Sequence, residues 1–335
     1  MPVTVPEVAS ANGGVQQPQQ PAPDRDALRK PRKGGWREVW RQLKQSRYYY
    51  AMFVIPFLFF IIFCYIPMFG IVIAFKNYNV FDGIAGSPWV GLQHFRNFLS
   101  DPYFYKLIRN TVLIGFYQIL FAFPAPIILA LLLNELRHAL FKRFVQTVSY
   151  LPHFLSTVVV CGIIVNFASF EGLINQFLGV LGMEPIHFLM MPEWFRTIYI
   201  SSEIWQGIGW GSIIFLAALS GIDSQLYEAA TIDGANRWRQ MWHVTLPGIA
   251  PTIIIMLLFS IGAIMAVSFE KVLLLSNGSN FETADIISTY VYRRGLVSSD
   301  FSYATAVGLF NSVVALVFLT IGNTLSRRVS ETSLW

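Results

Sequence analysis

Long apolar runs separated by short polar segments dominate the chain from residue 50 onward. A helix that crosses the hydrocarbon core of a bilayer needs about 20 mostly apolar residues, because lipid cannot satisfy free backbone polar groups. Six segments meet this requirement and predict an all-α membrane protein with about six transmembrane helices. The predicted spans are residues 50–75, 111–134, 148–167, 197–219, 251–269 and 304–325.

The first 49 residues follow a different pattern. Residues 1–35 are rich in Pro and Gln with little periodicity, which predicts a disordered tail. Residues 36–49 place Trp36 and Trp40 on one helical face, with Lys and Arg around the rest. This arrangement predicts an amphipathic helix in the headgroup plane, the alternative being the solvated start of the first span. Residues 50–328 are then the transmembrane domain.

Composition and charge agree with a membrane protein. The chain is 54% hydrophobic and only 13% charged, which is too little charge to cover the surface of a soluble protein of 335 residues. Its net charge of +5 comes from residues 1–49, which hold nine Lys or Arg and four Asp or Glu, whereas the rest holds fifteen of each. The basic tail indicates contact with anionic lipids, and no pattern typical of nucleic-acid binding occurs elsewhere.

The distribution of Lys and Arg predicts the orientation. Six spans put both termini on one side, and with the termini inside, the cytoplasmic segments carry sixteen Lys or Arg against eight outside. We therefore expect cytoplasmic termini and external loops at 76–110, 168–196 and 270–303. Residues 87–106 and 171–182 within these loops predict short interfacial helices.

One predicted cytoplasmic loop, between the fourth and fifth spans, stands apart. Ser224 is placed to cap a short helix, and Gly234 is placed to end it in the left-handed conformation. A second short helix over residues 237–243 is expected to stop at the prolines that follow, Pro247 and Pro251. The pattern predicts a compact helix–turn–helix knob below the membrane.

The same loop, residues 221–250, resembles the EAA loop of permeases of bacterial type I ABC importers, in which Glu-Ala-Ala, a Gly and a Leu-Pro pair recur at this spacing. The resemblance implies the type I importer permease fold, in the inner membrane, with the loop docked in a cleft of an ATPase subunit. Trp238 and Trp242 are expected to add apolar anchors there. The positions that match the motif are Glu228, Ala229, Ala230, Asp233, Gly234, Ala235, Leu246 and Pro247.

Two further stretches narrow the resemblance. Residues 86–92 with the following Phe95, and three tyrosines at 48–50, are similar to carbohydrate importers that take up oligosaccharides or polysaccharide fragments. The resemblance implies a second, different permease chain, an extracytoplasmic solute-binding protein, and two ATPase subunits that carry ATP and Mg. This chain has no phosphate-binding loop of its own, so we expect neither a cofactor nor enzymatic activity in it.

Polar residues inside the spans are candidates for the substrate path, because polar groups are costly in hydrocarbon. The candidates are Glu203, Trp205, Gln206 and Trp210 in the fourth span and Asn166 in the third. Amides and a carboxylate can hydrogen-bond to sugar hydroxyls, and indoles can stack on sugar rings. Taken one by one, these residues are better explained by helix packing and interfacial placement, and the two explanations are balanced only for the Glu203–Trp210 cluster as a whole.

Three other functions stay open on the sequence alone. An ABC importer permease for a non-sugar solute would show the same loop. A secondary transporter needs no ATPase and is typically built from inverted repeats with broken helices. A membrane-embedded transferase needs an acidic or metal-binding cluster at the bilayer edge, and the pattern suggests none.

Overall fold

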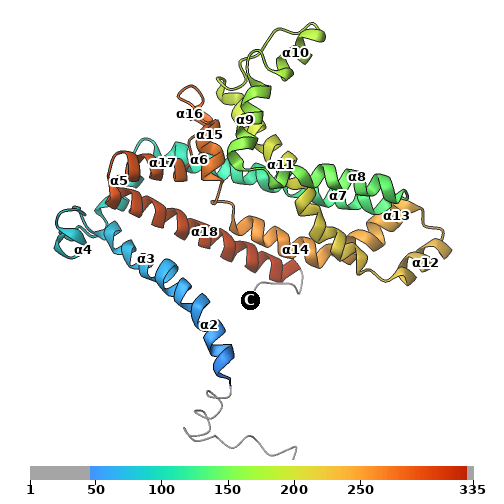
Figure 1. The fold of residues 1–335 in the computed structure, drawn as a ribbon, viewed down its shortest axis with the longest axis horizontal. Helices are drawn as coiled ribbons and strands as arrows, with labels where there is room; N and C mark the ends of the chain where they lie inside the picture. The colour runs from blue at the N-terminus through green and yellow to red at the C-terminus, as the bar shows by residue number, and fades with distance from the viewer. Residues whose placement is uncertain (1–45, 330–335) are drawn as a thin grey trace, which may run out of the picture. The chain divides into compact units, whose positions relative to one another are not determined.

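The protein is helical throughout the part that the structure, a computed structural model, describes, which is residues 46–329 (Figure 1). In that part the only β-type pairing is an isolated antiparallel bridge between Lys76 and Trp89. The predicted tail (1–35) and residues 36–45 of the predicted interfacial helix (36–49) lie outside the described residues.

Five helical stretches of the described part are long and apolar enough to cross a membrane, and a sixth is a helix pair bent by 71°. The predicted fold class, an all-α membrane protein with about six spans, is confirmed. The five stretches are Arg47–Phe75, Phe104–Glu135, Thr157–Val180, Arg237–Gly262 and Phe301–Thr324, and the bent pair is Pro192–Ser220 with Ser224–Ile232.

The chain divides into two compact units, Met1–Pro67 and Met68–Trp335. In the first unit, helix α2 (Arg47–Phe60) continues into the π-helix η2 (Ile61–Tyr65), and neither contains a buried residue. Large apolar side chains lie exposed along this helix. A helix that is apolar on all sides is suited to contact with lipid or with other spans rather than with water.

The remaining elements belong to the second unit, apart from the short helix α3, which crosses the boundary. In chain order they are α3 (Ile66–Met68), η3 (Phe69–Phe75), α4 (Gly83–Gly86), α5 (Gln93–Leu99), α6 (Phe104–Tyr117), η4 (Gln118–Ala122), α7 (Pro124–Glu135), α8 (Ala139–Tyr150), η5 (Leu151–Phe154), α9 (Thr157–Ala168), α10 (Leu173–Val180), α11 (Pro192–Ser220), α12 (Ser224–Ile232), α13 (Arg237–Gln240), η6 (Met241–Thr245), α14 (Leu246–Gly262), α15 (Phe269–Leu275), α16 (Phe281–Ala284), α17 (Ile287–Tyr292), η7 (Arg293–Val297) and α18 (Phe301–Val329).

Two buried clusters hold α11 in the middle of this unit. One joins α6, α9, α11 and α15 around Ile114 and Tyr199. The other joins α7, α11 and α14 around Ile127, Phe215 and Ile249. Helix α11 therefore packs against α6, α9 and α15 through its first half and against α7 and α14 near its end.

Two predicted spans differ from the helices observed. The predicted span 148–167 is interrupted at η5, after which Ser156 caps α9 by accepting a hydrogen bond from the Val159 N–H at 3.4 Å. The predicted span 251–269 is shifted, because α14 begins at Leu246 and ends at Gly262. After Gly262, the apolar residues Ile264, Met265 and Val267 are buried but not helical, so the hydropathy of this segment extended the prediction beyond the helix.

The segments that were predicted to be external contain short helices and polar side chains. Helices α5 and α10 lie inside the two stretches, 87–106 and 171–182, where short interfacial helices were expected. Asp101 accepts hydrogen bonds from the Tyr103 N–H (2.8 Å) and from the hydroxyls of Tyr290 (2.8 Å) and Tyr303 (3.0 Å). Burial by itself would raise the pKa of Asp101, but these hydrogen bonds and the charge of Arg294 outweigh it and lower the pKa below its ordinary value.

The close approach of α11 and α8 at Gly209 gives a stability prediction. A Cβ atom on Gly209 would overlap with the backbone carbonyl of Ser149, whereas a Cβ atom on Gly207 would meet nothing within 4 Å. We expect Gly209→Ala to destabilise the protein by about 1–3 kcal/mol through overpacking. Gly207→Ala, in the same helix, should be neutral or stabilising by up to about 1 kcal/mol. Thermal unfolding of the two purified variants tests this, and equal midpoints would contradict the packing described here.

Candidate functional site

The loop predicted to couple the protein to an ATPase begins with helix α12. Its N-terminal cap is Asp223, whose side-chain oxygen accepts a hydrogen bond from the Gln225 N–H at 2.9 Å. The prediction that Ser224 caps this helix was therefore wrong by one residue, because Ser224 is already its first helical residue. A carboxylate at this position also interacts favourably with the positive end of the helix dipole.

Gly234 ends α12 in the left-handed conformation, with φ of +74°, as predicted. The Gly234 N–H donates to the Thr231 carbonyl at 3.1 Å, and the Ala235 N–H donates to the Ala230 carbonyl at 2.8 Å. This pair of hydrogen bonds is the Schellman motif, which satisfies carbonyls left free at the helix end. A Cβ atom at Gly234 would lie in open space, so the backbone angle is the only constraint on this position.

The second half of the loop is one continuous helix rather than a short helix stopped by prolines. Asn236 caps α13 by accepting a hydrogen bond from the Arg239 N–H at 2.9 Å, and the helical stretch then runs unbroken to Gly262. Pro247 lies in the first turn of α14 and Pro251 lies inside that helix. The prediction that these prolines separate a helix over 237–243 from the next span was therefore wrong.

Side-chain hydrogen bonds hold the two halves of the loop together. The hydroxyls of Tyr227 and Thr245 lie 3.0 Å apart, and the Gln240 side-chain amide donates to the Thr231 hydroxyl at 2.9 Å. Arg237 forms an exposed ion pair with Glu135 at 3.1 Å, at the end of α7. We call residues 221–250, held together in this way, the coupling knob.

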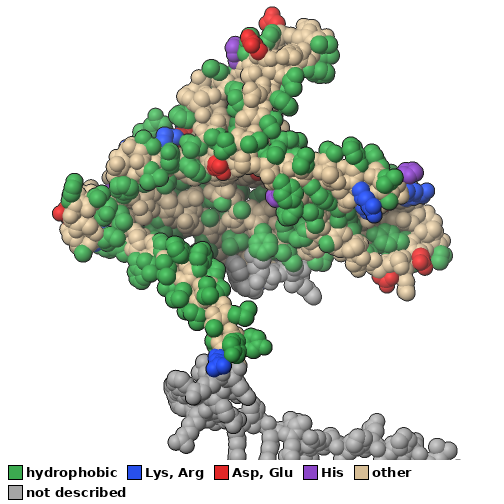
Figure 2. Space-filling view, in the orientation of Figure 1, with side chains coloured by type: hydrophobic (Ala, Val, Ile, Leu, Met, Phe, Trp, Pro, Cys, Tyr) green, Lys and Arg blue, Asp and Glu red, His purple; other side chains and the backbone are tan. Residues whose placement is uncertain are grey.

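The coupling knob exposes both acidic and apolar side chains. The side chains of Trp238 and Trp242 are 71% and 62% exposed, and Figure 2 shows acidic side chains at the tip of the same region. Exposed aromatic residues beside charged ones are typical of a protein-binding surface. Among the predicted coupling residues, Glu228, Ala229, Asp233, Gly234, Trp238, Trp242 and Pro247 are exposed, and Ala230, Ala235 and Leu246 are half-buried.

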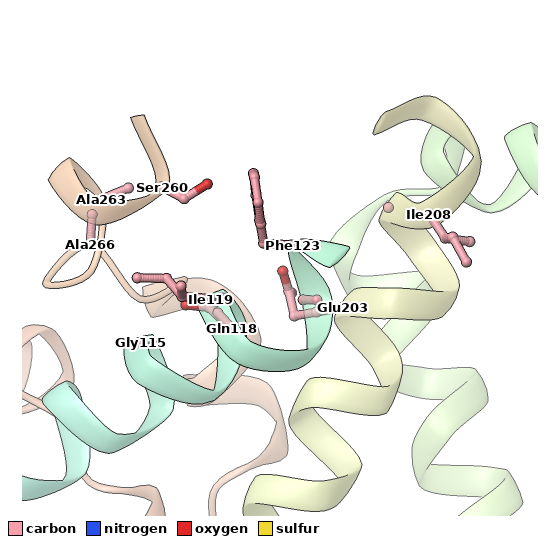
Figure 3. A pocket seen from close by; sticks show the side chains of 11 residues that line it. Gly115, Gln118, Ile119, Phe123, Glu203, Ile208, Ser260, Ala263 and Ala266 are labelled. Carbon is pink, nitrogen blue, oxygen red and sulfur yellow. The ribbon is translucent and has the colours of Figure 1, made fainter. Parts of the chain in front are cut away.

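A cavity of about 310 Å³ lies between three span helices, α6 with η4, α11 and α14 (Figure 3). Its polar lining comes from Gln118, Glu203 and Ser260, one from each helix. Its apolar lining includes Phe123 and Ala263. Glu203, one of the predicted path residues, therefore faces a space large enough for a small solute or part of a larger one.

Lys271 neutralises Glu203 and was missed by the sequence analysis. Its ammonium group forms an ion pair with the Glu203 carboxylate and donates to the Gln206 side-chain oxygen at 2.8 Å. The residue is only 2% exposed, whereas the Glu203 side chain is 26% exposed. A lysine inside the apolar stretch 269–275 was the available signal, because a charge in such a stretch usually has a partner.

Tyr199 connects this cluster to the irregular segment that follows α14. Its hydroxyl accepts hydrogen bonds from the Gln118 amide at 3.4 Å and from the Ser268 N–H at 3.3 Å. The Ser268 side chain in turn caps α15, close to Lys271. Polar groups from three separate chain segments are therefore joined beside the cavity.

The other predicted path residues lie apart from the ion pair. Trp210 stacks on His153, with ring centroids 4.6 Å apart and the planes 2° from parallel, so one indole face is already covered. Trp205 lines a separate apolar hollow of about 650 Å³ between α9, α10 and α11. The Asn166 side chain donates to the Gly162 carbonyl of its own helix at 2.9 Å. Of the five candidates, the structure brings only Glu203 and Gln206 together.

Comparison with known proteins decides the family. Residues 122–331, more than half of the chain, match the family described as binding-protein-dependent transport system inner membrane component. The chain belongs to this family.

Relatives of this inner membrane component are similar over nearly their whole length. The polygalacturonan/rhamnogalacturonan transport system permease protein YteP of Bacillus subtilis (strain 168) is 45% identical over 318 residues, 95% of this chain and 98% of that protein. A chain in the crystal structure of a bacterial alginate ABC transporter, in complex with alginate pentasaccharide-bound periplasmic protein, is 42% identical, with a TM-score of 0.82 over 88% of this chain and 99% of that chain. A second such structure, of an importer of the acidic polysaccharide alginate, is 43% identical with the same TM-score and coverage.

In this permease, the cavity and the coupling knob are built on the same two helices. Helix α11, which carries Glu203, leads into α12 through a bend of 71°. The other half of the knob continues without a break into α14, which carries Ser260. The helical stretch Arg237–Gly262 has 26 residues and is about 39 Å long at a rise of about 1.5 Å per residue. The knob and two of the cavity walls are thus parts of the same continuous or bent helices.

The ion pair at the cavity gives a second stability prediction. In Glu203→Gln the buried Lys271 ammonium loses its counter-charge, so we expect a loss of about 3–5 kcal/mol in the free energy of unfolding. The double variant with Lys271→Met should recover much of this loss, because no buried charge is left without a partner. Thermal unfolding of wild type, single and double variants measures it. A double variant less stable than Glu203→Gln alone would contradict the pairing.

Proposed function

We propose that this permease forms part of the path by which an oligosaccharide enters the cell. The observation that carries the proposal is the cavity between α6, α11 and α14, with its amide, carboxylate and hydroxyl groups, in a chain 45% identical to a polysaccharide transport permease. Sugar hydroxyls both donate and accept hydrogen bonds, and so do the groups that line the cavity. Gln206 does not line the cavity itself but contacts Lys271, the partner of the lining residue Glu203.

Transport by the assembled complex tests this substrate class. The purified complex in proteoliposomes, with its solute-binding protein, should take up labelled oligosaccharides in an ATP-dependent manner. Amino acids and short peptides of similar size should not be taken up. If the complex took up amino acids or peptides but no oligosaccharide, the result would favour the alternative, an importer for a non-sugar solute.

The proposal includes the partners and the orientation. We infer that the partners are two ATPase subunits that bind ATP and Mg, a second and different permease chain, and an extracytoplasmic solute-binding protein. The two permease chains lie in the bacterial inner membrane, in contact with its lipids. The alginate relative was crystallised as an ABC transporter in complex with a periplasmic protein, which supports the solute-binding protein. The Lys and Arg distribution supports cytoplasmic termini and a cytoplasmic coupling knob.

In the proposed mechanism, ATP-driven closure of the ATPase pair moves the coupling knob. The knob shifts as a unit because its halves are joined by the contacts of Tyr227 with Thr245 and of Gln240 with Thr231. The movement passes directly into α14, through the bend into α11, and through the Arg237–Glu135 ion pair to α7. The cavity then opens alternately to the two sides of the membrane, and no covalent chemistry takes place in this chain.

Gly234→Val tests the coupling knob. A β-branched residue at φ of +74° is strained by about 1–2 kcal/mol, so the helix–turn–helix should distort. We expect the variant to reach the membrane but to lose ATPase co-purification and transport. Gly234→Asn should retain both, because Asn tolerates this backbone conformation.

A matched control separates local strain from general instability. Gly182 has φ of +78° and equally open surroundings, but it lies outside the knob. Gly182→Val should therefore keep the ATPase bound. Full transport by Gly234→Val with its ATPase attached would refute the docking role of the knob.

A further inference from the structure

Helix α8 and the turn before it combine basic side chains that have no partner with an open apolar face. We propose that this surface binds an anionic phospholipid, with the headgroup at Arg137 and Arg143 and an acyl chain along the apolar face. None of these residues lines the cavity. The proposal therefore does not depend on which solute the permease carries.

One side of α8 packs on α11, and the other side is open. The packed side includes Ser149, whose backbone carbonyl lies close to Gly209 of α11. On the open side the side chains of Leu140, Phe144 and Val148 are exposed, that of Leu140 by 82%. Residues four apart in a helix lie on one face, so these three side chains form a single apolar stripe. No other segment of the described chain covers this stripe.

The basic side chains at the start of α8 are not neutralised by the protein. Arg137 and Arg143 are exposed, and Lys142 is half-buried. Within residues 46–329 none of the three side chains takes part in an ion pair or a hydrogen bond. The acidic residue next to them in the sequence, Glu135, is engaged with Arg237 at 3.1 Å. Figure 2 shows Lys and Arg side chains beside hydrophobic ones over this part of the molecule.

The dimensions of the surface match one phospholipid. Helix α8 has 12 residues and is about 18 Å long, and the hydrocarbon of one leaflet is about 15 Å thick, half of a core of about 30 Å. Arg137 lies two residues before the helix, and Arg143 follows Leu140 by three residues, which makes these two neighbours on the helix surface. The positive charge is therefore at one end of the apolar stripe, where long basic side chains can reach the headgroups.

Charge complementarity favours a lipid over a helix of another protein. A partner helix could cover the apolar stripe, but it would also have to supply a carboxylate opposite each arginine. An anionic phospholipid carries its phosphate and its acyl chain in one molecule, in the order in which α8 presents basic and apolar side chains. Basic residues at the membrane surface attract anionic headgroups, and arginine binds phosphate through paired hydrogen bonds.

Photolabelling of the reconstituted permease complex tests the proposal. The probe is a phosphatidylglycerol with a photoreactive group in its acyl chain, diluted in phosphatidylcholine vesicles, and mass spectrometry locates the label. We expect labelling within residues 139–154. Unlabelled phosphatidylglycerol should compete for this labelling, whereas soluble glycerol phosphate, which lacks the acyl chains, should not. The same photoreactive group on phosphatidylcholine should label this segment less.

Two double variants show whether the arginines select the lipid. Arg137→Gln with Arg143→Gln should raise the fraction of phosphatidylglycerol that gives half-maximal labelling about tenfold. Arg96→Gln with Arg109→Gln removes the same charge from exposed positions on α5 and α6 and should change that fraction less than about twofold. Because all four arginines are exposed, we expect both variants to unfold at the wild-type temperature.

Four results would overturn the proposal. Equal labelling by phosphatidylcholine would mean lipid contact without selection for charge, and full competition by glycerol phosphate would mean a site for a soluble anion. If neither lipid labelled residues 139–154, another protein, such as a second permease chain, would cover the stripe. Unchanged labelling in the Arg137→Gln, Arg143→Gln variant would exclude the arginines from the site.

Discussion

The ion pair between Lys271 and Glu203 is the interaction on which the arrangement around the cavity depends. A lysine that is 2% exposed cannot remain charged without a carboxylate close by, so the segment that carries it must lie against α11. This requirement fixes the irregular segment between α14 and α15, where Ser268 also contacts Tyr199. The Lys271–Glu203 ion pair and the hydrogen bond between Ser268 and Tyr199 therefore both hold this segment against α11.

The spans were predictable because their physical cause is local. A run of about 20 apolar residues is visible in the sequence whatever it packs against, and the positive φ of Gly234 follows from its place between two helical patterns. Lys271 was not predictable in the same way. Its partner lies 68 residues earlier in the chain, and only the packing of α15 on α11 and α9 brings the two together. Long-range pairing of this kind leaves no periodic signal.

The wrong predictions for the coupling knob have a different cause. Its residues were recognised from the sequence, but their local roles were misassigned. Asp223 and Ser224 are both good capping residues, and sequence alone cannot decide between neighbours. Pro247 and Pro251 were taken to stop a helix. However, the π-helical turn η6, directly before α14, changes which carbonyls need a donor, so the missing N–H of Pro247 does not end the helix there. The helix therefore continues through both prolines into the membrane.

In the proposed mechanism, that continuity determines how a docked ATPase acts on the cavity. Gln118 and Glu203 lie on α6–α7 and α11, and Ser260 lies on α14, so the cavity has three walls. Each wall is linked to the coupling knob, α11 through a bend, α14 by unbroken helix, and α7 by the exposed Arg237–Glu135 pair. An exposed ion pair contributes only about 0–1 kcal/mol, so the third link is weak and the two covalent ones dominate. Movement of the knob must then change the distance between α11 and α14 more than it displaces α7. Under the proposed coupling, the separation of Glu203 and Ser260, which line the cavity from these two helices, therefore changes with the position of the knob.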